Sequence, residues 1–377
     1  MKPLHRVLLM YCTILLPMVL NAQSKTINVL IGTYTNTGKS KGIYLYDFDL
    51  NTGRLSLKNE IESANPSFLA LSSDRKYLYA VNELEKGAGA ISAFQYERAA
   101  GKISLLNTQL TEGGSPCHVT VDANTRYAVA SNYSGGSFTV FGIQPDGRLS
   151  EKVQLVKHEG SGPDKSRQEG PHVHSATLSP DGKFLLVQDL GTDRITVYRY
   201  DASDNNQPVS LTAVNEVKAS PGSGPRHLTF SKDGKYVYLV QEMKAAVTVY
   251  SYEDGHLTRL QEVSMLAPSF NGEVGAADIH ISPDGKFLYA SNRGDANDIA
   301  IYSINDTTGE INHIGNQSVK GKGPRNFAIA PNGKFLLVAN QYTDEVVVFA
   351  RNEETGRLTD TGNRIEVGAP VCVLFDE

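Results

Sequence analysis

The segment SPDGKFLLVQD (Ser179–Asp189) decides the fold, because copies of it return along the chain at a nearly constant spacing. The copies are SSDRKYLYAVN (Ser72–Asn82), DANTRYAVASN (Asp122–Asn132), SKDGKYVYLVQ (Ser231–Gln241), SPDGKFLYASN (Ser282–Asn292) and APNGKFLLVAN (Ala330–Asn340). The aromatic residues that open these predicted strands are Tyr77, Tyr127, Phe184, Tyr236, Phe287 and Phe335. They are 50, 57, 52, 51 and 48 residues apart, so the chain is built from repeats of about 50 residues.

Each repeat contains four predicted strands. The aromatic strand is followed by a segment of alternating apolar and polar residues, such as RITVYRY (Arg194–Tyr200), which is typical of a half-buried strand. A glycine-centred turn then leads to a polar strand, and a further strand, such as PRHLTFS (Pro225–Ser231), precedes each turn of the SPDGK type. Four antiparallel strands in a unit of this length form one blade of a β-propeller.

The two ends of the chain complete one another. The last residues, PVCVLFDE (Pro370–Glu377), match the strand before the SPDGK turn, whereas INVLIGTYT (Ile27–Thr35) matches the strand after it. Pairing these segments within one blade would hide two sheet edges. The sequence therefore predicts an all-β, seven-bladed β-propeller with four antiparallel strands per blade, closed by its N- and C-terminal strands and occupying residues 23–377 as one domain.

Residues 1–22 differ from the rest of the chain. Positively charged residues precede an apolar run at Val7–Leu20, and the small residue Ala22 follows it. This pattern predicts a signal peptide over residues 1–22 and export to the periplasm or the extracellular space. An uncleaved membrane anchor is the alternative, although the run is short for a span. If the segment is not a working signal, the protein is cytoplasmic; once it is cleaved, no membrane contact is expected.

Composition excludes several classes of protein. The chain of 377 residues has a net charge of −5 and no basic run, so a nucleic-acid partner is not expected. Beyond the N-terminal segment only Cys117 and Cys372 remain, too few for a disulfide scaffold or a thiolate zinc site; two free thiols and a disulfide both stay open. Phosphate loops, nucleotide motifs and a G-x-S-x-G elbow are absent, so neither a cofactor nor serine catalysis is expected.

At two positions of the repeat, the chemical type of the side chain differs from blade to blade. The residue after the aromatic strand is Glu83, Tyr133, Leu190, Glu242, Arg293 or Gln341. The strand before the SPDGK turn opens with Ser67-Phe68, Cys117-His118, His174-Ser175, Arg226-His227, Ala277-Asp278 or Arg325-Asn326. Both positions should lie at the same end of every blade, because a strand enters where its hairpin partner leaves. Seven blades would then direct these side chains at one central opening, which makes it the candidate site.

The predicted ring of unlike residues contains His118, His174, Arg226, Glu242, Arg293 and Arg325, with His172, His227 and Asp278 nearby. Asn132 belongs to a recurring polar position at the strand end, where a hydrogen-bonding role in the scaffold is the first interpretation, and it is also a candidate for substrate binding. The longest interval between repeats contains HEGSGPDKSRQEGPHVH (His158–His174). Long loops over a rigid scaffold often shape a binding site, although this loop could equally be an ordinary solvated one.

Several of these segments resemble a known family. PHVHSATLSPDGKFLLVQDLGTDR, GPRHLTFSKDGKYVYLVQEM, IHISPDGKFLYASNRG and GPRNFAIAPNGKFLLVAN are similar to segments of the seven-bladed propeller lactonases. That family includes the propeller type of 6-phosphogluconolactonase and the fungal 3-carboxy-cis,cis-muconate lactonizing enzyme. The resemblance extends from the GTYT segment at Gly32 to the C-terminus. It implies a lactonase built on a propeller.

The resemblance also implies a catalytic set. The matching positions are His174 in PHVHSA, Arg226 in GPRH, Glu242 in VQEM and Arg293 in SNRG. Substrate-binding residues are then expected at His118, His172, His227, Arg325, Asn132 and Asp278. Two positions depart mildly from the family pattern: Asp278 stands where relatives carry Glu, and Met243 where they carry Leu. The export signal is the larger departure, because 6-phosphogluconolactone is a cytosolic metabolite.

The chemistry of these residues suits lactone hydrolysis, which needs a base for water and a cation facing the developing oxyanion. Either His174 or Glu242 can be the base, and Arg226 with Arg293 can hold the oxyanion or an acidic substituent. We therefore expect a monomeric hydrolase acting on an acidic sugar lactone, most like 6-phosphogluconolactone, without metal or cofactor. The alternatives are carboxymuconate lactonization, hydrolysis of another lactone, a calcium-dependent lactonase, and a non-catalytic propeller that binds a glycan or a protein.

Overall fold

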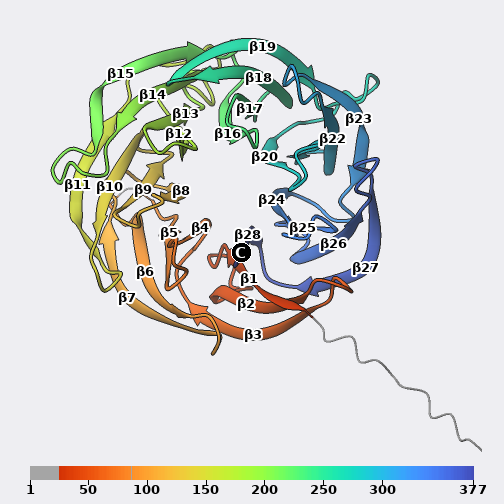
Figure 1. The fold of residues 1–377 in the computed structure, drawn as a ribbon, viewed down its shortest axis with the longest axis horizontal. Coiled ribbons are helices and arrows are strands. Elements are labelled where there is room, and N and C mark those ends of the chain that lie inside the picture. The colour runs from red at the N-terminus through yellow and green to blue at the C-terminus, as the bar shows by residue number, and fades with distance from the viewer. Residues whose placement is uncertain (1–24, 86) are drawn as a thin grey trace, which may run out of the picture.

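The computed structural model describes residues 25–85 and 87–377, which form seven four-stranded antiparallel sheets arranged around a central axis (Figure 1). The predicted seven-bladed propeller is confirmed. The predicted signal peptide at residues 1–22 lies outside the described residues. Among the residues described, no helix has the length and apolar character needed to cross a membrane.

Each blade runs outward from an inner strand at the axis (Figure 1). The closing blade contains β28 (Pro370–Phe375), β1 (Thr26–Thr33), β2 (Gly42–Asp49) and β3 (Leu55–Glu62). The next two contain β4 (Leu69–Leu71), β5 (Tyr77–Asn82), β6 (Ala90–Glu97) and β7 (Lys102–Leu110), then β8 (Pro116–Val121), β9 (Tyr127–Asn132), β10 (Ser137–Ile143) and β11 (Leu149–Lys157).

The remaining four blades follow in chain order. They contain β12 (Val173–Leu178), β13 (Phe184–Asp189), β14 (Arg194–Tyr200) and β15 (Val209–Lys218); β16 (Pro225–Phe230), β17 (Tyr236–Gln241), β18 (Ala246–Glu253) and β19 (His256–Ser264); β20 (Ala276–Ile281), β21 (Phe287–Asn292), β22 (Asp298–Ile304) and β23 (Ile311–Ser318); β24 (Pro324–Ile329), β25 (Phe335–Asn340), β26 (Glu345–Arg351) and β27 (Leu358–Glu366).

The hydrophobic core lies between blades. The middle strands are apolar on both faces, and each face packs against the neighbouring blade. Leu337 and Val348 of one blade, for example, pack with Val29 and Phe48 of the next. The core is thus a ring of interfaces that holds the blades at fixed angles around the axis.

The SPDGK segments form the tight turns that the sequence predicts. In the turn before β13, Asp181 Oδ1 accepts hydrogen bonds from the Ser179 hydroxyl (2.6 Å) and the Lys183 N–H (3.2 Å). Gly182 has φ of 68°, a conformation that favours glycine. These repeated polar residues therefore stabilise turns of the scaffold.

The ring closes by pairing β28 with β1. The two strands are antiparallel, with Val29 opposite Phe375 and Ile31 opposite Val373. Gly32 in β1 is required by packing, because a Cβ atom there would lie 2.3 Å from the Pro66 carbonyl oxygen. The first and last strands of the propeller thereby share one sheet.

Asp376, directly after β28, connects the closing blade to the next one. Its side chain is fully buried, and Oδ2 lies 2.7 Å from Arg98 Nε and accepts a hydrogen bond from the Tyr96 hydroxyl (2.9 Å). Arg98 also donates to the Asp376 carbonyl oxygen (2.8 Å), and the Asp376 N–H donates to the Asn28 carbonyl oxygen (3.0 Å). The C-terminus is therefore fixed by one charged residue.

We expect Asp376→Ala to lower the free energy of unfolding by about 3 kcal/mol, because it leaves buried hydrogen-bonding groups of its neighbours without a partner. Denaturant unfolding followed by circular dichroism measures the loss. Glu97→Ala is the matched control, since Glu97 pairs with Lys102 at 3.3 Å on the exposed surface; its cost should stay below about 1 kcal/mol. Equal costs for the two variants would contradict a special role for Asp376.

Candidate active site

A polar cavity of about 360 Å³ lies where the blades meet at one end of the axis. Its lining residues are Tyr34, Glu83, Cys117, Tyr133, Arg167, His174, Glu242, Arg293 and Arg325. Every blade contributes at least one of them. The sequence prediction that unlike side chains from successive blades share one opening therefore describes this cavity.

A recurring β-bulge directs the inner-strand residues into the cavity. In β12, Val173 pairs with Asp189 and Ser175 with Gln188, so His174 is left without a partner in the ladder. The same break leaves out Cys117 in β8, Arg226 in β16 and Arg325 in β24. Bulges re-aim side chains while the flanking strand stays paired. They bring Cys117, His174 and Arg325 to the lining of the cavity, whereas Arg226 at the equivalent place packs against Glu242 outside the lining.

Glu242 is the centre of a cluster of arginines. Its Oε2 lies 2.9 Å from Arg226 Nε and 3.3 Å from Arg293 Nη2, and its Oε1 accepts a hydrogen bond from Arg167 Nη2 (2.7 Å). Burial alone would raise the pKa of Glu242, but the charges of Arg293, Arg226 and Arg167 outweigh it and hold that pKa well below its usual range. Glu242 is therefore a carboxylate at neutral pH.

Arg226 is the most enclosed of these cations, with 2% of its surface exposed. Burial and the neighbouring charge of Arg293 lower its pKa to about 10, so it stays protonated at neutral pH. Its Nη1 donates to the Ala277 carbonyl oxygen and lies 3.4 Å from His227 Nε2. Arg226 is thus held in one orientation by groups on all sides.

His174 lies beside the carboxylate, with Nε2 3.9 Å from Glu242 Oε2. Its Nδ1 lies 3.8 Å from the sulfur of Cys117, whose thiol donates to the His174 carbonyl oxygen (3.2 Å). Burial, together with the charge of Arg226, keeps the pKa of His174 well below its ordinary value of 6.5. The imidazole is therefore neutral at neutral pH. Burial also raises the pKa of the Cys117 thiol, which stays protonated.

The opposite wall of the cavity carries Arg325, Tyr34 and Glu83. The Arg325 guanidinium lies over the Tyr34 ring, 5.3 Å from its centroid, and its Nη2 is 3.9 Å from Glu83 Oε1. The Tyr34 hydroxyl donates to Glu83 Oε2 (2.8 Å). Unlike Arg226, Arg325 makes no side-chain hydrogen bond with any described residue, so its N–H groups face the cavity available for a ligand.

Three predicted substrate-binding residues lie behind Arg226 and are not part of the cavity wall. His227 Nδ1 is 2.8 Å from Asp278 Oδ1, and Asp278 Oδ2 is 2.8 Å from His280 Nε2. The His118 ring packs against His227 at 5.5 Å between centroids. Burial and Arg226 lower the pKa of His227 to about 4, so it is neutral and accepts from Arg226. These residues pack behind Arg226, on the side away from the cavity, and hold its side chain in position.

Two other predicted residues also lie outside the lining of the cavity. Asn132 is fully buried in its own blade, where its amide donates to Ser137 Oγ (3.2 Å) and Thr139 Oγ1 (3.0 Å). It therefore has the scaffold role that was its first interpretation. His172 lies outside the lining and stacks on Tyr133, with ring centroids 4.5 Å apart. It holds the wall of the cavity in place.

Sequence reasoning missed two lining residues. Tyr34 follows β1 and occupies the same repeat position as Glu242, a relation hidden because its blade is split between the chain ends. Arg167 comes from the loop between β11 and β12, which the sequence marked only by its length. Gln168 anchors that loop by donating to Asp193 Oδ1 (2.8 Å) and to the Leu190 carbonyl oxygen (2.8 Å).

The two cysteines of the described chain, Cys117 and Cys372, are free and buried. In residues 25–85 and 87–377, no group of three or more His, Cys, Asp or Glu side chains is arranged to hold a metal ion.

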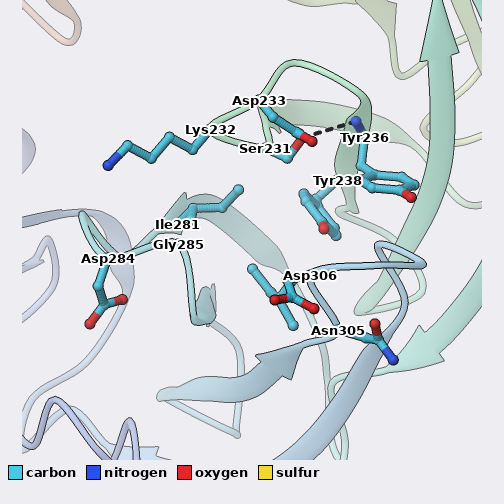
Figure 2. A pocket seen from close by; sticks show the side chains of 11 residues that line it. Ser231, Lys232, Asp233, Tyr236, Tyr238, Ile281, Asp284, Gly285, Asn305 and Asp306 are labelled. Carbon is cyan, nitrogen blue, oxygen red and sulfur yellow. Dashed lines mark hydrogen bonds between the residues drawn. The ribbon is translucent and has the colours of Figure 1, made fainter.

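A second cavity, of about 240 Å³, is lined by residues of two neighbouring blades (Figure 2). Figure 2 shows Asp233, Asp284 and Asp306 on its edges, and the Tyr236 N–H donating to Ser231 Oγ (2.9 Å). These residues belong to turns that recur in other blades. Because Lys232 is the only cation in its lining, this cavity lacks the converging charges found at the axis.

Comparison with known proteins agrees with this geometry. The profile of the family described as "Lactonase, 7-bladed beta-propeller" matches residues 28–375. A 6-phosphogluconolactonase of Formosa agariphila is 39% identical over 88% of this chain and 94% of its own. The 6-phosphogluconolactonase of Bacillus subtilis is 35% identical over 92% of this chain and 97% of its own.

Solved structures give the same result. The crystal structure of a candidate 6-phosphogluconolactonase from Bacteroides fragilis has a TM-score of 0.90 and 43% identity, covering 95% of this chain and 99% of that one. The periplasmic gluconolactonase PpgL of Pseudomonas aeruginosa has a TM-score of 0.88 and 36% identity, covering 93% and 99%. The chain therefore belongs to the seven-bladed β-propeller lactonase family and is a 6-phosphogluconolactonase-like lactonase.

Proposed function

We propose that the protein hydrolyses the lactone of an acidic sugar acid, with 6-phosphogluconolactone converted to 6-phosphogluconate as the best candidate reaction. The observation that carries this proposal is the convergence of three arginines on a cavity with only two carboxylates, Glu83 and Glu242. A fourth arginine, Arg226, lies outside the lining and pairs with Glu242. Such a cavity attracts anions and stabilises the negative charge that develops on a lactone carbonyl oxygen. The names of the relatives support the same substrate class.

We assign the base to His174. A carboxylate paired with three arginines is a poor proton acceptor, whereas a neutral imidazole with Nε2 facing the cavity is a better one. The 3.9 Å between His174 Nε2 and Glu242 Oε2 allows a single water to donate hydrogen bonds to both. Glu242 then orients the water and the arginines, and His174 removes the proton.

The reaction proceeds through a tetrahedral intermediate. Water attacks the lactone carbonyl carbon as His174 takes its proton, and the carbonyl oxygen becomes an oxyanion facing Arg293. Arg293 is held for this role because its Nε donates to the Gly275 carbonyl oxygen (2.9 Å). When the intermediate collapses, the bond to the ring oxygen breaks, and the imidazolium returns its proton to that oxygen. The product is the open sugar acid.

Arg325 is proposed to bind the acidic substituent of the substrate. It faces the cavity from the wall opposite Glu242, and no described residue accepts a hydrogen bond from its side chain. A guanidinium in this state binds a phosphate or carboxylate through two parallel hydrogen bonds. The long 3.9 Å contact with Glu83 keeps the cation in place without occupying its donors.

Export and a monomeric state are also proposed. The signal-like pattern over residues 1–22 and the periplasmic location named for PpgL support export. Ring closure buries both faces of every blade against its neighbours, which supports a monomer.

Glu242→Gln and Arg293→Ala should each lower kcat/KM about 10²- to 10³-fold, because each removes a charge that orients the water or stabilises the oxyanion. Steady-state assays with glucono-, 6-phosphoglucono- and muconolactones measure the effect, and near-UV circular dichroism checks that the variants are folded. Glu97→Gln, on the exposed surface, is the control. Wild-type activity in both site variants would remove the catalytic assignment.

The acid limb of the pH profile of kcat/KM should lie below the ordinary histidine pKa of 6.5, because burial and Arg226 lower the pKa of His174. The base must be unprotonated, so activity persists as pH falls through 6.5 and declines only at lower pH. Initial rates at low substrate concentration between about pH 4 and 8 provide the measurement. A limb at or above 6.5 would contradict the assignment of His174 as the base.

Arg325→Gln should raise KM for 6-phosphogluconolactone about 10- to 100-fold, with little change in kcat. This range corresponds to the binding free energy that is lost with one hydrogen bond to a charged group. KM for uncharged glucono-lactone should change less than threefold. Kinetics with the two lactones on wild type and variant separate the effects. Equal losses on both substrates would show that Arg325 does not recognise the charged group.

A further inference from the structure

A second hollow, which we call the outer lobe, shares part of its wall with the catalytic cavity. The outer lobe has a volume of about 350 Å³ and shares Tyr34 and Glu83 with the catalytic cavity. Its other lining residues are Asn36, Thr37, Asn65, Glu85, Ser115 and Gln341. The hydrogen-bonded Tyr34–Glu83 pair therefore belongs to the walls of both hollows, and a substituent on a lactone in the catalytic cavity would have to extend past this pair to enter the outer lobe.

The chemistry of the outer lobe is opposite to that of the catalytic cavity. Its lining contains two carboxylates, three amides and three hydroxyl groups, and no Lys, Arg or His. Such a surface repels a phosphate or carboxylate. Carboxylate and amide oxygens accept hydrogen bonds from hydroxyl groups, and the amides and hydroxyls can donate in return. The lining therefore suits a neutral group with many hydroxyls.

Part of the lobe is rigid. Asn65 Oδ1 accepts hydrogen bonds from the N–H groups of Thr35 (2.8 Å) and Asn36 (3.1 Å), and its amide donates to the Glu83 carbonyl oxygen (3.1 Å). These bonds tie the segment after β1 to the segment after β5. The shape of the lobe is thus set before any ligand arrives, which lowers the cost of binding.

Gln341 lines the outer lobe, and Tyr342 follows it in the chain without being part of the lining. Gln341 Oε1 is buried but has no hydrogen-bond partner among the described residues. Tyr342, the next residue, is 62% exposed, and its ring lies so close to Gly323 that a Cβ atom there would be 2.5 Å from it. An exposed ring fixed against backbone offers a flat apolar surface for the C–H face of a sugar.

We propose that the outer lobe is a subsite for a neutral sugar unit, so that the substrates include lactones of glycosylated sugar acids. This inference rests on the proposed lactonase function and extends it. The lactone ring occupies the catalytic cavity, while the attached sugar donates hydroxyl hydrogen bonds to Glu83 and Gln341 and packs on Tyr342. Charged substituents are directed to Arg325 and neutral ones to the outer lobe, because the two regions differ in charge.

The test compares glucono-lactone with maltobionolactone, the lactone of a disaccharide acid, on wild-type protein. KM for the disaccharide lactone should be at least about tenfold lower, which corresponds to about 1.4 kcal/mol of added binding. Gln341→Ala and Tyr342→Ala should each reverse most of this gain and leave glucono-lactone kinetics unchanged. Leu211→Ala, which removes a residue 64% exposed on β15, is the control and should change neither substrate.

The outcomes distinguish the two proposals. If glucono-lactone is hydrolysed but the disaccharide lactone shows no lower KM, or if the Gln341 and Tyr342 variants affect both lactones equally, the subsite is wrong and the lactonase assignment stands. If no lactone is hydrolysed, the proposed reaction fails. Calorimetric binding of maltobionate to wild type and Gln341→Ala then decides the subsite by itself: tighter binding to wild type supports it, and equal or absent binding overturns it.

Discussion

The antiparallel pairing of β28 with β1 is the contact on which the rest of the structure depends. The blades are held by apolar faces that each need a neighbour, so an open arc would leave two such faces in water. Closure also fixes the axis, because seven blades can meet at one point only when the last is bonded to the first. The residues of the site that belong to repeat positions reach the cavity because the blades share that axis, and Arg167 is added from a loop.

The cavity at the propeller axis depends on a balance between buried carboxylates and buried arginines. Glu242 neutralises part of the positive charge of three arginines and thereby allows Arg226 to stay protonated while almost fully buried. Behind it, the hydrogen-bonded chain of His227, Asp278 and His280 continues this arrangement through the axis. Asp278 is surrounded by donors, and although burial would raise its pKa, His280 and His227 outweigh that effect and keep it low. The arginines are consequently fixed before substrate binds, as electrostatic catalysis requires.

The repeat allowed most of the fold to be predicted. The six aromatic residues identified in the sequence open β5, β9, β13, β17, β21 and β25. The strand positions could be read from the turn residues and from the alternation of apolar and polar residues, because every blade repeats the same pattern. The meeting of His174, Arg226, Glu242, Arg293 and Arg325 was also predictable, because it follows from repeat positions and rotational symmetry.

What the repeat does not encode could not be predicted. Arg167 reaches Glu242 from a loop that occurs once, so no other blade indicates its direction. His227 and Asp278 stand next to positions that face the cavity, but neighbouring residues of a bulged strand diverge, and sequence does not locate the bulge. The outer lobe likewise depends on how segments after β1, β5 and β25 pack together.

The bulge in the inner strands has an evolutionary consequence. A residue that takes no part in the ladder can be exchanged without altering the hydrogen bonds on either side of it, as the presence of Cys117, His174, Arg226 and Arg325 at equivalent places illustrates. Selection can therefore revise the chemistry of the opening one blade at a time while the toroid keeps its stability. In such a scaffold the residues that pair in the strand ladders must be preserved, whereas the bulged residues are free to vary.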